Sequence, residues 1–273
     1  GMFMKWDPKI NKLTNLGMGI KYQSIKDIDM DPQTGLLYAI TYPQSHFLVY
    51  DPSKNDLRDM GRLGSGHTPR IIFTDWWGNC YYTDWRQRLV KYEKSTGSLV
   101  FADESLPAFP GTPGLRIIHG LTSYSKDYRN GVIYMITYGG KILAFQPTEK
   151  GIGKITDLGC VVDFGNKEPY DHYVPNMNIG SNGKLYYVIG GHGNYVKDNT
   201  TLLVEFDPKL KKHKILAEFP LSIMCEATGC DVRDKDGNMY FLGRYDKEGA
   251  RSDGSVGSVA VLLKFNPEKE IRK

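Results

Sequence analysis

Short runs of apolar residues alternating with polar ones follow one another along the whole chain, and clusters of Gly, Pro, Asp or Asn separate them. One unit is complete between about residues 21 and 63, with runs at 25–30, 36–42, 47–51 and 56–63. Runs of this length, rich in Tyr, Ile, Val and Leu and divided by turn residues, are typical of antiparallel strands. No helical period of useful length is present. The pattern therefore predicts an all-β chain built from four-stranded units.

The third strand of each unit ends in nearly the same short sequence, an aromatic residue followed by a polar residue and proline. The copies are Trp6-Asp7-Pro8, Tyr50-Asp51-Pro52, Phe145-Gln146-Pro147, Phe206-Asp207-Pro208 and Phe265-Asn266-Pro267, with Tyr92-Glu93 lacking the proline. They recur about every 42 to 61 residues, which is the period of β-propeller blades. The sequence predicts a single β-propeller domain over residues 1–273, with five full blades of four antiparallel strands, an N-terminal partial blade, and six or seven blade positions.

The two ends of the repeat are uneven, because the chain begins with a third strand. Either the leading hairpin forms a partial sixth blade beside the first full one, or the natural protein has one or two further blades before it. An open blade edge leaves backbone donors unpaired. We expect the N-terminal hairpin, the C-terminal EKEIRK segment or another copy of the chain to fill the gap. The last case would be self-association through an open blade edge.

One face of a propeller collects the loops between second and third strands and the segments that lead into each blade. Five of the six histidines fall on this face by sequence position, and arginines and tyrosines accompany them. Guanidinium groups bind carboxylates in a bidentate manner, and tyrosine rings present flat surface to sugars. The tight turns on the other face are read as structural. The pattern predicts a funnel for a saccharide or a small anionic molecule, with His46, His67, Arg70, Arg86, His119, Tyr138, His172, Tyr173, His192 and Arg244 as ligand-binding residues.

A metal site is a second hypothesis. His67, His119, His172 and Glu226 each lead into a blade and could converge, and such a set suits a divalent metal such as zinc or manganese. The chain would then be a metal-dependent lyase or hydrolase acting on polysaccharide-derived fragments. Against both ideas stands the plainer interpretation that these polar side chains satisfy backbone groups or line a water-filled channel. A protein-interaction scaffold is a third hypothesis, with Trp76 and Trp77 as its surface. No Walker, zinc-protease or nucleophile-elbow motif is present.

Net charge, apolar run length, the first residues and the cysteines limit the expected partners and cellular location. The net charge of +4 is small and dispersed, so nucleic acid is not expected as a partner. No run of about 18 apolar residues exists, so no membrane span is expected. Gly1-Met2 resembles a tag remnant, and a signal peptide removed before it would place the protein in the periplasm or outside the cell. Cys225 and Cys230 are a candidate disulfide or metal pair, with two packed thiols as the alternative.

The blade-building sequences also resemble those of a known group. Gly78-Asn79 before Tyr81-Tyr82, the GKLYY run at 183–187 and the EFDP run at 205–208 resemble bacterial propellers of the streptogramin-lyase, SMP-30 and YVTN kind. That group includes lactonases and lyases that act through a metal and a histidine. The resemblance implies the fold over nearly the whole chain. It carries no catalytic residue over, because the shared positions build blades.

Overall fold

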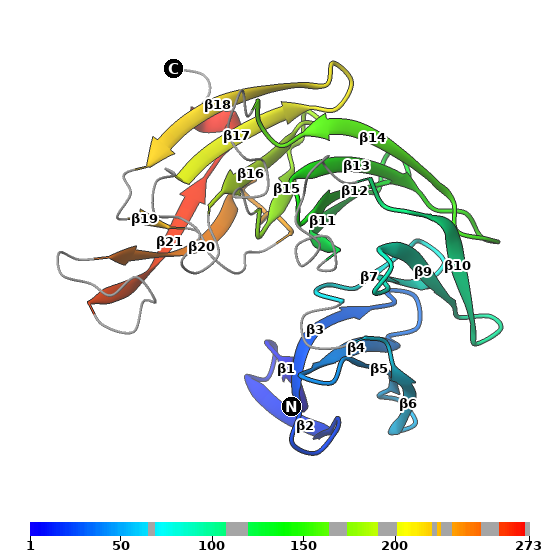
Figure 1. Cartoon of the computed structure of the whole chain (residues 1–273). Coiled ribbons are helices and arrows are strands. Elements are labelled where there is room, and N and C mark those ends of the chain that lie inside the picture. Colours follow the sequence, from blue (N-terminus) through cyan, green and yellow to red (C-terminus); the bar gives the residue numbers. More distant parts are fainter. Residues whose placement is uncertain are drawn as a thin grey trace. The chain divides into compact units, whose positions relative to one another are not determined.

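The computed structural model describes residues 1–64, 69–107, 120–163, 174–190, 201–219, 223–224, 231–246 and 257–270. Within these residues the strands form six antiparallel sheets (Figure 1). The chain divides into two compact units. The first comprises residues 1–106 with the short segments 118–121 and 147–153, and the second comprises 107–117, 122–146 and 154–273.

The first unit begins with a two-stranded hairpin and continues with two four-stranded sheets. In each sheet the strands lie in chain order, so every connection is a simple antiparallel turn or loop. The hairpin consists of β1 (Met2–Asp7) and β2 (Lys12–Met18). The sheets consist of β3 (Ser24–Met30), β4 (Leu37–Tyr42), β5 (His46–Asp51) and β6 (Asp56–Arg62), and of β7 (Phe73–Thr74), β8 (Cys80–Thr83), β9 (Arg88–Glu93) and β10 (Ser98–Ser105).

The second unit holds two four-stranded sheets and one of three strands, again in chain order. Leu121, the first residue of β11, is counted with the first unit. The four-stranded sheets consist of β11 (Leu121–Asp127), β12 (Val132–Thr137), β13 (Lys141–Gln146) and β14 (Lys154–Cys160), and of β15 (Met177–Ile179), β16 (Leu185–Ile189), β17 (Thr201–Asp207) and β18 (Lys212–Phe219). The third consists of β19 (Ile223–Met224), β20 (Met239–Asp246) and β21 (Ser258–Phe265), after which α2 (Pro267–Glu270) follows.

The second and third strands of the sheets are buried on both faces because sheets stack face to face. In β4 and β5 four consecutive residues are buried, so these strands read as continuous apolar runs. Tyr38, Phe47 and Tyr92 join the first two four-stranded sheets in one apolar cluster, with ring centroids 5.5 to 6.0 Å apart. Offset and edge-on contacts of this kind add to the stability that burial provides.

The second unit repeats this packing. Leu158 of β14 and Val204 and Phe206 of β17 belong to one apolar cluster. Tyr186 of β16 packs on Phe265 of β21 with ring centroids 5.6 Å apart. In the copies at Tyr50, Phe145, Phe206 and Phe265 the aromatic residue of the aromatic–polar–proline sequence is buried, whereas Trp6 of the leading hairpin is half exposed.

The leading hairpin covers one face of the first four-stranded sheet. Phe3 stacks on Tyr50 at 5.0 Å, and the Tyr50 hydroxyl donates to the Leu16 carbonyl at 2.8 Å. The hairpin thus occupies the position of a neighbouring sheet, as the partial-blade interpretation predicts. Its other face leaves Met4, Trp6 and Leu13 about half exposed.

The tight turns use one aspartate to hold several donors. The Oδ1 atom of Asp75 accepts the N–H groups of Trp77 and Asn79, each at 2.9 Å, and its Oδ2 atom accepts the side chains of Asn79 and Tyr81. Asp234 receives the equivalent four bonds in the turn before β20. The glycine three residues after each aspartate has φ of 81°, a conformation that favours glycine.

Three of the fourth strands, β2, β6 and β14, share a β-bulge with a defined sequence. Gly17, Gly61 and Gly159 have φ of 119°, 96° and 109°. The N–H of each donates to the side chain two residues earlier, Asn15, Asp59 or Asp157, at 2.8 to 2.9 Å. The register with the third strand shifts at this point in all three sheets. A bulge of this kind increases the local twist and bends the strand.

Three elements differ from the sequence prediction. Of the strand predicted over 70–75, only the two residues of β7 form a strand. The prediction of an inner strand over 226–234 is wrong in its described part, because residues 231–234 lead into the Asp234 turn without forming a strand. Residues 225–230, with Cys225 and Cys230, lie outside the described residues. The described part of the C-terminal segment is a short helix, since Asn266 accepts the N–H groups of Glu268 and Lys269 and Pro267 supplies a helical φ.

Candidate functional site

Half of the predicted ligand-binding residues lie outside the described residues, namely His67, His119, His172, Tyr173 and His192. Glu226 does too, so the whole predicted metal set stays a prediction. Among the described residues no group of three or more His, Cys, Asp or Glu side chains could hold a metal ion. His46, Arg70 and Arg86 belong to the first unit, and Tyr138 and Arg244 belong to the second.

His46 is engaged by its own sheet. Its Nδ1 atom lies 2.8 Å from Oδ2 of Asp59 on β6, and its side chain is 21% exposed. Asp59 is also the acceptor for the bulge glycine Gly61. The imidazole thus contacts the outermost strand of its own sheet. Its role in a ligand-binding funnel stays a prediction.

Arg86 lies in an exposed loop and stacks on Trp85, with the guanidinium carbon 4.7 Å from the ring centroid. Asp84 holds this loop. Its Oδ1 atom accepts the N–H groups of Arg86 and Arg88, and its Oδ2 atom receives two bonds from the Arg88 guanidinium at 2.8 and 2.9 Å. The result is an ordered, exposed cation–π pair, which is a surface suited to planar anions and sugar rings.

Two predicted ligand-binding residues, Tyr138 and Arg244, lie in the second unit. Tyr138 directly follows β12 and is 7% exposed, so its ring is part of the packed interior. Arg244 lies on β20, opposite Met224 of β19. Tyr138 therefore resembles a core residue more than a surface ligand contact.

Arg70 lies close to a lysine that the sequence analysis did not select. Lys26 lies in a bulge of β3, since Ile25 pairs with Thr41 and Asp27 with Ile40, which leaves Lys26 outside the register. Its ammonium donates to the Pro69 carbonyl at 2.9 Å. Burial, together with the charge of Arg70, lowers the pKa of Lys26 to about 7, although Asp27 acts in the opposite direction.

A signal for Lys26 does exist in the sequence. IKDIDM breaks strict alternation, because Lys26 and Asp27 are consecutive polar residues in a strand that otherwise alternates polar and apolar positions. Asp27 and Asp29 bind the next sheet, accepting the N–H groups of Ile72 and Thr74 at 2.8 and 2.6 Å. Bulges are frequent where a side chain is redirected towards a site. The positional argument missed it because it considered loops and ignored inner strands.

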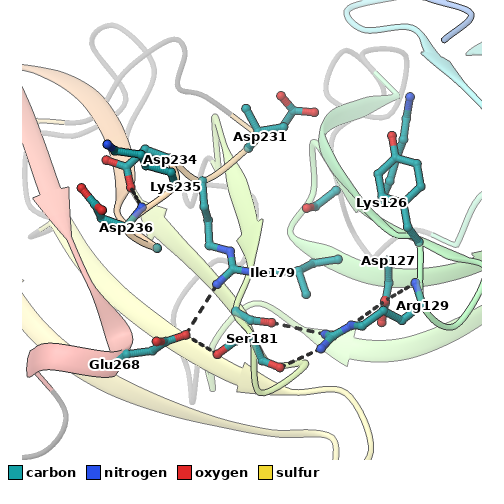
Figure 2. Close-up of a pocket in the computed structure, with 16 residues that line it drawn as sticks. Lys126, Asp127, Arg129, Ile179, Ser181, Asp231, Asp234, Lys235, Asp236 and Glu268 are labelled. Atoms are coloured by element: carbon teal, nitrogen blue, oxygen red, sulfur yellow. Dashed lines mark hydrogen bonds and ion pairs between the residues drawn. The ribbon is translucent and has the colours of Figure 1, made fainter.

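A hollow lies among the tight turns of the second unit (Figure 2). It has a volume of about 570 Å³, within the range of ligand pockets. Three turn segments and α2 border it, so it belongs to the side that the sequence analysis took as structural. The lining residues are Ser125, Lys126, Asp127, Tyr128, Arg129, Ile179, Gly180, Ser181, Asp231, Val232, Arg233, Asp234, Lys235, Asp236, Gly237 and Glu268.

Hydrogen bonds between sheets hold the walls of this hollow. Arg129 donates to the Ser181 carbonyl at 2.8 Å, which ties the third four-stranded sheet to the fourth. The Ser181 hydroxyl donates to Glu268, and Arg233 lies 3.9 Å from the same carboxylate. Figure 2 shows Glu268 and Arg129 on either side of Ser181.

Charges of both signs line the hollow. Asp234 is fixed in its turn, where hydrogen bonds from Asn238 and Tyr240 hold its pKa well below the usual value. Tyr128 and Val232 are 69% and 61% exposed and offer apolar surface at the same place. This combination of fixed charges and exposed apolar groups suits a ligand with both charges, such as a polypeptide segment.

Comparison with known proteins gives the fold and leaves the family open. No family model and no curated protein matches the chain. A chain of the nidogen/laminin complex is 14% identical with a TM-score of 0.55, covering 96% of this chain and 87% of that one. YCF48 bound to D1 peptide is 11% identical (TM-score 0.52, 92% and 71% covered), and the RRP9 WD40 repeats are 9% identical (0.55, 97% and 74%).

The fold is a β-propeller. Identities this low show the architecture alone, because one fold serves many unrelated functions. Within the described residues no helix is long and apolar enough to cross a membrane. The Lys26–Arg70 pair lies in the first unit of the propeller and the turn-side hollow lies in the second, and each is a candidate site by itself.

Proposed function

We propose that this propeller is a binding protein for a small anionic molecule, with a saccharide-derived carboxylate such as a uronate as the leading class. The observation that carries the proposal is the bulged Lys26 of β3, whose ammonium donates to the carbonyl of Pro69, the residue before Arg70. Two neighbouring cations repel each other, and a bound carboxylate offsets that repulsion. The exposed Arg86–Trp85 pair belongs to the same unit and offers ring-stacking surface.

The proposal predicts coupling between binding and protonation. A carboxylate favours the charged form of Lys26, whose pKa is about 7 without ligand. Affinity should therefore be greatest below pH 7 and should fall by up to about tenfold per pH unit above it. Calorimetry in buffers of different ionisation enthalpy would show proton uptake at pH 8.

The test is a glycan and uronate array followed by titration of the best ligand. Arg70→Ala should weaken binding about tenfold or more, because a charge-assisted bond is lost. Lys26→Met should remove the pH dependence between 7 and 9. Arg58→Ala is the matched control, since Arg58 is half exposed and pairs with Asp56 on β6. Unchanged binding in both site variants would contradict the proposal.

A second candidate function is a protein-interaction scaffold that holds a polypeptide in the turn-side hollow. The mixed charges and the exposed Tyr128 and Val232 favour it, as do the complexes of two structures of similar fold, one with laminin and one with a D1 peptide. Val232→Asp should then weaken binding of a partner found by pull-down, with Leu210→Asp as an exposed control. The lyase or hydrolase hypothesis and the kinship with streptogramin-lyase-like propellers stay predictions.

A further inference from the structure

The fifth sheet of the repeat has three strands, where each of the other full sheets has four. Among the described residues β21 pairs with β20 alone, while β5, β9, β13 and β17 at the same position each pair with a fourth strand. The outer edge of β21 therefore presents backbone donors and acceptors without a strand beside it in the described part of the chain. Such an edge is a template for strand addition.

An apolar groove follows this edge. It has a volume of about 260 Å³ and is bordered by four consecutive residues of β21, from Leu262 to Phe265. Side chains of consecutive strand residues point to opposite faces, so a groove that all four border runs along the strand edge. Phe219 of β18 and Phe241 of β20 form its apolar walls. Leu262 is 58% exposed there.

The chain's own fourth strands show what fits beside a third strand. The aromatic residue of the third strand lies opposite an aliphatic one in Trp6–Leu13, Tyr50–Leu57, Tyr92–Leu99 and Phe145–Ile155, whereas Phe206 lies opposite His213. Leu57 enters the apolar cluster between the hairpin and the first sheet. An aliphatic residue opposite Phe265 would enter the groove between the fourth and fifth sheets in the same way.

The bulge defines the rest of the pattern. Two positions after the aliphatic residue stands Asn15, Asp59 or Asp157, then Leu16, Met60 or Leu158, then the glycine with positive φ. The carboxylate or amide accepts the glycine N–H and so fixes the bulge. A strand with this sequence can form the bulge, and the bulge gives it the extra twist and bend of an outermost blade strand, which a regular strand lacks.

The charge of Lys264 on β21 suggests one more position in the sequence pattern of a bound strand. Glu205 of β17 lies opposite Lys214 of β18 in the register of the fourth sheet, and its carboxylate forms an ion pair with Lys184. In β21 the equivalent residue is Lys264, because Lys264-Phe265-Asn266-Pro267 aligns with Glu205-Phe206-Asp207-Pro208. An acidic residue opposite Lys264 would be the complementary choice.

We propose that the outer edge of β21 binds an extended strand of another polypeptide with the pattern aliphatic–acidic–(Asp or Asn)–(Leu or Met)–Gly. The three segments of this chain that carry the bulge sequence are already paired in their own sheets, which favours a different protein over a second copy. The proposal involves no residue of the Lys26–Arg70 site, so either can fail alone.

The test uses the full chain and a synthetic peptide with the sequence of residues 153–161, bearing Thr156→Glu and Cys160→Ser. We expect a dissociation constant of about 100 µM or tighter. Hydrogen exchange should slow in residues 258–265 when the peptide binds. A matched peptide that also carries Ile155→Asp should bind at least tenfold more weakly, since its charge cannot enter the apolar groove.

Protein variants complete the design. Leu262→Lys should weaken the first peptide at least tenfold, and Leu210→Lys, on a turn where the side chain is 67% exposed, should leave binding unchanged. Absence of binding, or equal binding of the two peptides, would overturn the proposal. So would amides of β21 that are already as protected as those of β17 without peptide, because the chain itself would then cover the edge. A dimer that Leu262→Lys dissociates would identify a second copy as the occupant and would also overturn it.

Discussion

The carboxylate of Asp75 accepts a hydrogen bond from the hydroxyl of Tyr81 at 2.9 Å, and Asp234 accepts the equivalent bond from Tyr240 at 2.7 Å. Both pairs join a tight turn to the strand that follows it. Asp75 is 2% exposed and Tyr81 is fully buried, so neither polar group has water as an alternative partner. The turn and the strand are consequently a single hydrogen-bonded unit.

Tyr81→Phe should lower the free energy of unfolding by about 1–2 kcal/mol, because a buried acceptor on Asp75 loses one of its donors. Asp75→Asn should cost more, since an amide nitrogen in place of Oδ2 cannot accept from Asn79 and Tyr81. Denaturant unfolding measures both, and Tyr22→Phe is the control because Tyr22 is 90% exposed. If the double variant cost as much as the two single ones together, the residues would not be coupled.

Alanine substitutions at Gly78 and Gly35 would distinguish the cost of a positive φ from the cost of a steric clash. Both have positive φ, 81° and 74°, but a Cβ on Gly78 would lie 2.5 Å from the Asp31 carboxylate, whereas one on Gly35 would meet nothing within 4 Å. Gly35→Ala should destabilise by about 1 kcal/mol and Gly78→Ala by about 3 kcal/mol. Equal losses in thermal or denaturant unfolding would show that φ alone matters.

Asp31 should make stability depend on pH in the acid range. Burial alone would raise the pKa of Asp31, but hydrogen bonds from Lys94, Thr34 and the Gln33 N–H outweigh it and hold the pKa below its ordinary value. A carboxyl whose pKa is lower in the folded chain stabilises above its unfolded pKa of about 4, and that contribution disappears as pH falls further.

The check on Asp31 is the free energy of unfolding measured between pH 6 and pH 3 in the wild type and in Lys94→Met. The Lys94 ammonium lies 2.8 Å from Oδ2 of Asp31, so the variant should be less stable at pH 6 and should lose less on acidification. Parallel curves for the two proteins would exclude this ion pair as a source of the pH dependence.

Lys91 is fully buried and holds the segment between β13 and β14. Its ammonium donates to the carbonyls of Thr148, Glu149 and Gly151 at 2.7 to 3.0 Å. Lys91→Met should destabilise by about 2–4 kcal/mol, because three carbonyls lose a charged donor at once.

Hydrogen exchange checks that prediction locally. Amides of residues 147–153 should exchange faster in Lys91→Met, and those of β4 and β5 should not change. Lys154→Met is a matched control, since Lys154 is exposed at the start of β14. Uniform acceleration over the first unit would indicate global destabilisation and no specific role in holding this segment.

The sequence predicted the strands well where one repeated signal determined both packing and turn. Tyr50-Asp51-Pro52 and Phe206-Asp207-Pro208 end a third strand in the structure as expected, because an aromatic core residue followed by turn residues allows few alternatives. The short inner strands were less predictable. Phe73 and Thr74 form a two-residue strand whose pairing depends on Asp29 of the preceding sheet, 45 residues away.

The candidate site was predicted only in part. Arg70 was selected by its position before a strand, while Lys26 gains its importance from burial and from Arg70, neither of which a local pattern contains. The Asp234 turn was read as structural, yet the hollow beside it forms only where Arg129 and Ser181, from the turns of two sheets, and Glu268, from α2, come together.

The amino-acid sequence by itself determined that this chain folds into repeated antiparallel sheets, since strand period, turn glycines and aromatic anchors are local properties that each unit carries complete. Only the tertiary structure decided which charged groups become neighbours and which strand edge has no strand beside it in the described residues. Both depend on contacts between residues that are distant in sequence, and the energy of such contacts has no trace in either segment alone.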